Sequence, residues 1–127
     1  LQCALMLSYF SYRFLHLLGI FMVLLSLGGL LAARAVSQER SFPWKGLLTA
    51  VHGIGLLIVF VAGFGLLARL EIEWTDQGWV YLKMLVWLVI GLVPVFARKI
   101  PDRAQLLFWL SLAAAVLAAY LATFKPF

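Results

Sequence analysis

The sequence predicts an all-α integral membrane protein, an antiparallel four-helix bundle that forms one transmembrane domain over residues 1–127. Composition is the first observation behind this prediction: 65% of the residues are hydrophobic, only 12% are charged, and the mean hydropathy is +1.07. A soluble domain of this length leaves too much of its surface in water to bury so much apolar area. The second observation is a set of four long apolar runs, at about residues 10–33, 47–70, 78–97 and 104–123.

Each run is long enough for one membrane-spanning helix. A helix needs roughly 20 apolar residues to cross about 30 Å of hydrocarbon, whereas barrel strands are shorter and alternate polar with apolar residues. These runs do not alternate, and backbone groups in hydrocarbon must be satisfied within the protein, so we expect helices. The connections are short, which makes consecutive helices antiparallel neighbours.

Small residues recur on one face of the first, second and fourth runs. Gly55 and Gly63 share a face of the second run, and Ser111, Ala115 and Ala118 follow a similar stripe on the fourth. The first run has Ser26, Gly29 and Ala33. Small side chains let helix backbones approach closely in lipid. We expect these faces to pack within the bundle, and the alternatives are a dock for another protein's helix or room for a flat cofactor.

The third run contains a proline and a lysine. Pro94 removes one backbone hydrogen bond and predicts a bend. Lys83 shares a helix face with Trp79 and Trp87, so its stem can pack on the indoles while the ammonium reaches the headgroups, with a cation–π contact to Trp79. The alternative is that Lys83 pairs inside the bundle with an acid, a porphyrin propionate or a lipid phosphate. Asp102, after Pro101, is expected to cap the fourth helix.

Basic residues divide unequally between the two ends of the predicted bundle. The connections at 34–46 and 98–103 hold Arg34, Arg40, Lys45, Arg98, Lys99 and Arg103, whereas the other end holds Arg13, Arg69 and Lys125. Short loops rich in Lys and Arg stay in the cytoplasm. We therefore expect a multi-pass protein of the plasma (inner) membrane with both termini on the non-cytoplasmic side. The bases mark helix ends and form no soluble patch, so no nucleic-acid partner is expected.

His16, His52 and Lys83 are the ionisable groups within or near the spans. Such groups are functional candidates because burying them in the membrane is costly. Counting 1.5 Å per residue places His16 and Lys83 at a similar outer depth, below the acids of the 70–77 connection, and His52 roughly 15 Å deeper. Both histidines are candidate metal ligands, but not for the same ion. The alternative for each imidazole is a hydrogen bond to a neighbouring helix or loop.

A family resemblance rests on three features: Leu15-His16 near the start of the first helix, a glycine-rich second helix, and Gly78-Trp79 followed by Lys83. Together they resemble small bacterial inner-membrane proteins that include the copper-resistance D-type domain and the bacterial membrane protoporphyrinogen oxidase. The resemblance implies that His16 and Lys83 bind a cofactor and that the protein handles porphyrin or copper. The run HGIGLLIVFVAGFGLLARL also resembles uncharacterised four-helix bacterial proteins, which implies no activity.

Two functions therefore stand as hypotheses. The first is a small accessory subunit, without enzymatic activity, that packs in the bilayer against larger integral membrane proteins of a respiratory or photosynthetic electron-transport complex. Few polar side chains and several small-residue faces favour it. The second is a membrane enzyme that handles haem, another porphyrin or copper through His16 and Lys83. The sequence does not identify a cofactor: a chlorophyll-type pigment is an alternative to haem or another porphyrin, lipids are further ligands, and no residue is assigned a catalytic role.

Overall fold

Four long helices make up most of the computed structural model, which describes residues 2–36 and 44–126, with side chains from residue 8 onward. They are α1 (Gln2–Val36), α2 (Lys45–Arg69), α3 (Gly78–Lys99) and α4 (Ala104–Phe124), and two 3-10 turns, η1 (Trp74–Asp76) and η2 (Pro101–Arg103), precede α3 and α4. All four helices are long and apolar enough to cross a membrane. The predicted all-α class with four spans of membrane length is therefore confirmed.

α1, α3 and α4 end beyond the apolar runs that predicted them, whereas α2 ends one residue before the end of its run. α1 begins at Gln2 and ends at Val36, and α3 continues to Lys99. The backbone hydrogen bonds of a helix do not require apolar side chains, so a helix can continue into polar residues at the end of a span. The predicted cap at Asp102 is wrong: this residue lies in η2, and the N-cap of α4 is Arg103, without a side-chain hydrogen bond. Arg40, counted above among the bases of the 34–46 connection, lies outside the described residues, and Arg34 is buried.

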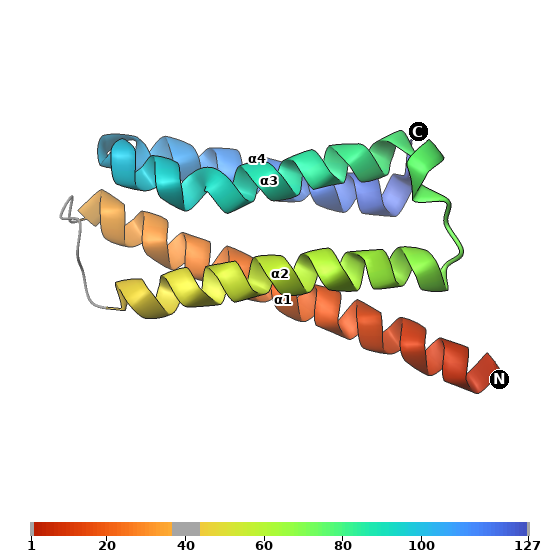
Figure 1. Cartoon of the computed structure of the whole chain (residues 1–127). Coiled ribbons are helices and arrows are strands. Elements are labelled where there is room, and N and C mark those ends of the chain that lie inside the picture. The colour runs from red at the N-terminus through yellow and green to blue at the C-terminus, as the bar shows by residue number, and fades with distance from the viewer. Residues whose placement is uncertain (1, 37–43, 127) are drawn as a thin grey trace.

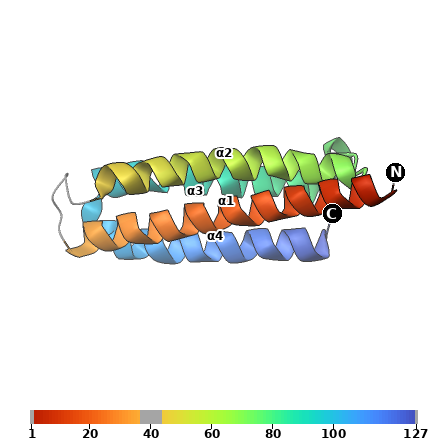
Figure 2. The same ribbon diagram turned by 90° about the horizontal axis from the view of Figure 1, so that it is seen from below.

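Two pairs of helices form the molecule. In Figure 1, α1 and α2 lie below α3 and α4, and Figure 2 shows the same arrangement from below. η2 lies at the end where α1 stops and α2 starts, which we call the basic end; the start of α1, η1 and the end of α4 lie at the opposite end, which we call the η1 end. The first turns of α1 diverge from the other helices (Figure 1).

A close backbone contact joins α1 to α2 through two glycines. A Cβ at Gly55 would lie 3.0 Å from the carbonyl oxygen of Gly19 and 2.9 Å from Cγ2 of Val23, and a Cβ at Gly19 would lie 3.0 Å from the carbonyl oxygen of Gly55. Only glycine allows two backbones to approach in this way. The contact pairs run in opposite numerical order along the two helices: Tyr12 with Gly65, His16 with Gly63, Gly19 with Gly55 and Gly29 with Leu48.

A separate apolar core joins α1 to α3 and α4. Its buried side chains are Val23, Leu27 and Leu31 from α1, Val86, Ile90, Val93 and Ala97 from α3, and Leu107 from α4. The outward side chains are apolar as well: Leu25 is 80% exposed and Phe14 67% exposed. Exposed apolar surface of this extent is unusual for a soluble monomer and matches helices that face hydrocarbon.

The small residues singled out in the sequence lie toward the interior of the bundle. Gly55 is buried against α1, and Gly63 faces His16. Ser111 is buried and donates its hydroxyl to the carbonyl of Leu107 at 2.8 Å. Ala118 packs against the core, and Ala115 is half-buried. These faces are therefore occupied by the bundle's own helices.

Gly55→Ala is expected to destabilise the protein, whereas Gly53→Ala is not. The new methyl group at position 55 meets backbone and Cβ atoms of α1 that cannot rotate away, and overpacking of this kind costs about 1–3 kcal/mol. At Gly53 no atom lies within 4 Å of the added Cβ, so the change affects only helix propensity. The free energy of unfolding in mixed micelles measures both, and equal values for the two variants would contradict the close α1–α2 contact.

Candidate functional site

His16 projects from α1 against α2 and is held by one hydrogen bond. Its Nδ1 lies 3.1 Å from the carbonyl oxygen of Val59. A carbonyl only accepts, so Nδ1 carries the proton and Nε2 keeps its lone pair. Gly63 leaves room for the ring, since a Cβ there would lie 3.3 Å from Cε1 of His16. An imidazole whose Nδ1–H is fixed by a backbone carbonyl is the arrangement usual for histidines that bind through Nε2.

Lys83 of α3 lies near two other basic groups. The side chain is half-buried and close enough to both His16 and Lys125 to interact with them electrostatically. The structure therefore brings together His16 and Lys83, two of the three ionisable residues that the sequence singled out. We call His16, Lys83 and Lys125 the basic cluster; it lies in the half of the bundle nearer the η1 end.

Lys125 reaches the basic cluster because of how α4 ends. Its backbone is in the left-handed region (φ 46°), and its N–H bonds the carbonyl of Leu121 at 2.9 Å, which closes the last turn. The ammonium then lies 5.7 Å from the ring centroid of Trp79. Trp79 is buried and donates its indole N–H to Oε1 of Gln77 at 3.0 Å. The cation that the structure places beside the Trp79 ring is thus Lys125, whereas the sequence predicted Lys83.

Acidic side chains do not balance these charges in the described part of the chain. Glu71, Glu73 and Asp76 lie around η1 and are exposed. No ion pair to Lys83 or Lys125 is formed within residues 8–36 and 44–126. The basic cluster therefore has a net positive charge that the described side chains leave uncompensated.

His52 lies elsewhere in the bundle, away from the basic cluster. It is buried on α2, and the backbone carbonyls of Val23, Ile90 and Gly91 are close enough to interact with its ring. His16 meets α2 at Val59, seven residues further along. At 1.5 Å per residue the two rings sit at levels about 10 Å apart. The structure does not bring the two histidines together around one ion.

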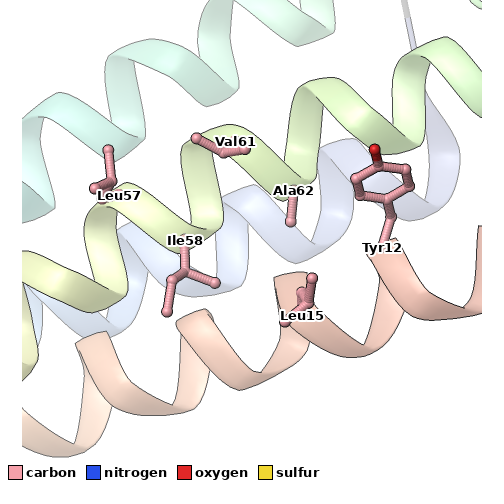
Figure 3. Close-up of a pocket in the computed structure, with 6 residues that line it drawn as sticks. All are labelled: Tyr12, Leu15, Leu57, Ile58, Val61 and Ala62. Atoms are coloured by element: carbon pink, nitrogen blue, oxygen red, sulfur yellow. The ribbon is translucent and has the colours of Figure 1, made fainter.

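Two grooves on the described surface are apolar. One, of about 260 Å³, lies between α1 and α2 and is lined by Tyr12, Leu15, Leu57, Ile58, Val61 and Ala62 (Figure 3). A second, of about 470 Å³, is a shallow surface formed by Phe21, Leu24 and Leu25. Sites that enclose a small molecule usually measure about 300–1,000 Å³ and carry a few convergent polar groups. Neither of the two grooves brings together polar groups of this kind.

Metal-binding side chains do not gather in the described residues: no group of three or more His, Cys, Asp or Glu could hold an ion there.

Comparison with protein-family models, curated proteins and solved structures gives no match to this chain. The resemblance to the copper-resistance D-type domain and the membrane protoporphyrinogen oxidase stays a prediction. The sequence predicted Lys125 at the same end of the bundle as Lys83, but not as a site residue. Four spans bring the C-terminus to that end, and this is the signal that could have pointed to Lys125.

The hydrogen bond to Val59 predicts the tautomer of His16. In the neutral ring we expect the proton on Nδ1 and the lone pair on Nε2. Nitrogen-15 NMR of the histidine-labelled protein in lipid nanodiscs distinguishes the two nitrogens by their chemical shifts. The chain has two histidines, so His52→Gln leaves one set of signals to assign. A bare Nδ1 would contradict the geometry, because it would face a carbonyl lone pair.

Proposed function

We propose that this protein binds the acidic group of an amphipathic membrane ligand of the porphyrin class at the basic cluster. One observation carries the proposal: three basic groups from three segments of the chain converge without an acidic partner among the described residues. An unpaired cation in a membrane span is costly. A bound carboxylate would neutralise that charge and form charge-assisted hydrogen bonds, which are about twice as strong as neutral ones.

The chemistry of the cluster favours a porphyrin among such anions. A porphyrin carries carboxylates beside a large flat apolar ring, so its acidic groups suit Lys83 and Lys125 and its ring suits the surrounding hydrocarbon. His16 adds a neutral Nε2, which can ligate the metal of a metalloporphyrin or accept a proton. The sequence resemblance implies the same pair, His16 and Lys83. A lipid phosphate would satisfy the two lysines but would make no use of Nε2.

The proposal includes the arrangement in the membrane. The four helices would cross the plasma (inner) membrane as an antiparallel bundle, with the basic end in the cytoplasm. The excess of Lys and Arg at the basic end supports this orientation. The basic cluster would then lie in the outer half of the bilayer, within reach of a ligand that enters from the lipid.

An accessory role in an electron-transport complex remains a second proposal. It is supported by the small fraction of the α2 and α4 spans that is buried, 17% in each, which leaves broad apolar faces for lipid or for larger integral membrane proteins. The inward position of Gly55, Ser111 and Ala118 removes one argument for it, because these residues pack inside the bundle. The basic cluster is therefore the more specific feature.

Lys83→Met is expected to weaken porphyrin binding about tenfold, equivalent to about 1.4 kcal/mol, the lower end of what a hydrogen bond to a charged group contributes. A dicarboxylic porphyrin is titrated into nanodiscs of uncharged phosphatidylcholine that contain the protein, and its absorption shift is followed. Lys99→Met is the matched control: it removes the same charge from the same helix, at an exposed position of the basic end, and should not change the dissociation constant.

Three outcomes would contradict the porphyrin proposal. The first is equal binding of the diacid and its uncharged dimethyl ester, and the second is equal weakening by Lys83→Met and Lys99→Met. The third is that an anionic phospholipid competes as strongly as the porphyrin itself, which would identify the ligand as a lipid. A colourless 14.2 kDa chain that purifies from its native membrane only within a large complex would favour the accessory role.

The orientation has its own test. A reporter enzyme that is active only outside the cytoplasm is fused after Phe127 or inserted in the 98–103 connection. We expect activity from the first fusion and none from the second, because the basic connection is retained in the cytoplasm. The reverse pattern would contradict the proposed orientation and would place the basic cluster in the cytoplasmic half of the bilayer.

A further inference from the structure

His52 is a buried polar side chain that the proposed function leaves without a role. It is 4% exposed and lies where α2 meets α1 and α3. Both ring nitrogens are covered, and neither has a hydrogen-bond partner with good geometry in the described part of the chain. Leaving a buried polar group without a partner destabilises a protein. The nearby polar groups are the carbonyls of Val23, Ile90 and Gly91, and all three are acceptors.

Pro94 explains why one of these carbonyls differs from the others. α3 runs without interruption from Gly78 to Lys99 with Pro94 inside it. In an α-helix the N–H of residue i bonds the carbonyl of residue i−4, and proline has no N–H. The carbonyl of Ile90 is four residues before Pro94, so it lacks its helical donor. In hydrocarbon such a freed carbonyl is satisfied by a side chain or a water from its surroundings.

The other two carbonyls already have donors. The carbonyl of Val23 accepts the N–H of its own helix, and the Ser26 hydroxyl also lies 3.1 Å from it, although that hydroxyl is closer to the carbonyl of Met22, at 2.5 Å. The carbonyl of Gly91 is four residues before Val95, which keeps its N–H. A neutral imidazole has one N–H to donate. Among the three nearby carbonyls, only that of Ile90 lacks a donor, so it is the acceptor that the imidazole N–H would satisfy.

We propose that His52 donates its ring N–H to the Ile90 carbonyl that Pro94 leaves free, and that this bond is a latch that joins α2 to α3 beside Pro94. The latch fixes the segment of α3 that follows Pro94 against α2. Its loss leaves both the imidazole and the carbonyl without a partner and frees that segment to change its angle. The latch does not depend on the ligand of the basic cluster, so either proposal can fail alone.

A double-mutant cycle tests the latch. Pro94→Ala restores an N–H to the Ile90 carbonyl, and His52→Leu removes the imidazole donor. The unfolding equilibrium constant is measured in micelles for the original chain, both single variants and the double variant. We expect the factor by which His52→Leu favours unfolding to be about tenfold larger in the original chain than in the Pro94→Ala background. Equal factors in the two backgrounds would overturn the proposal, because a packing role of the ring does not depend on Pro94.

Trp87→Phe supplies the matched control. The Trp87 indole also joins α3 to α2, through a 3.0 Å hydrogen bond to the carbonyl of Leu56, but that acceptor does not depend on Pro94. The effect of Trp87→Phe on the unfolding equilibrium is expected to be the same in the original chain and in the Pro94→Ala background. A coupling as large as that of His52 would show that Pro94→Ala perturbs the whole α2–α3 interface, and would overturn the specific latch.

A direct measurement covers the case in which a variant does not fold. Nitrogen-15 NMR of the unaltered protein should show one protonated His52 nitrogen with a slowly exchanging proton, close in space to the Ile90 carbonyl carbon labelled with carbon-13. Spin labels at the exposed positions Leu47 and Phe96 should give a narrow distance distribution that broadens in His52→Leu. A rapidly exchanging imidazole proton, or an unchanged distribution in a folded His52→Leu, would overturn the latch.

Discussion

The constraint on which this structure depends is that hydrocarbon offers no hydrogen bonds, so each polar group in the bundle must find a partner in the protein or in a ligand. Ring N–H groups on two helices meet this constraint in the same way. His16 donates from α1 to the Val59 carbonyl, and Trp87 donates from α3 to the Leu56 carbonyl. Both acceptors are backbone atoms of α2. The polar side chains thus join α2 to its two neighbours at defined positions along its length.

Close packing makes these bonds possible. The glycine contact between Gly19 and Gly55 brings the backbones of α1 and α2 together, and Gly63 leaves space for the imidazole of His16 beside the Val59 carbonyl. A larger residue at either glycine of α2 would move the ring away from its acceptor. The glycines therefore contribute twice, because they permit dispersion contacts between backbones and because they bring a donor within reach of a carbonyl on another helix.

The number of helices could be predicted from the sequence because the bilayer thickness fixes the length of an apolar span. Counting residues along the spans also put His16 and Lys83 in one layer. What counting could not give is the rotation of each helix about its axis. A helix that is apolar all round has no hydrophobic stripe to choose its inner face, so close contacts such as Gly55 against Val23 decide it. The contact of Lys125 with Trp79 depends on the left-handed turn that ends α4, and the residue types at this position do not predict such a turn.

The two polar regions of the bundle differ in what can satisfy them. In the latch that we propose beside Pro94, the donor is on α2 and the acceptor on α3, so the chain itself can complete the pair. In the basic cluster, Lys83 and Lys125 supply only donors and positive charge, and the nearby acids are exposed around η1. Donors without acceptors cannot satisfy one another, whatever small movements the helices make. The partner that we propose for Lys83 is therefore an anion from outside the described residues, with an apolar body that is soluble in lipid.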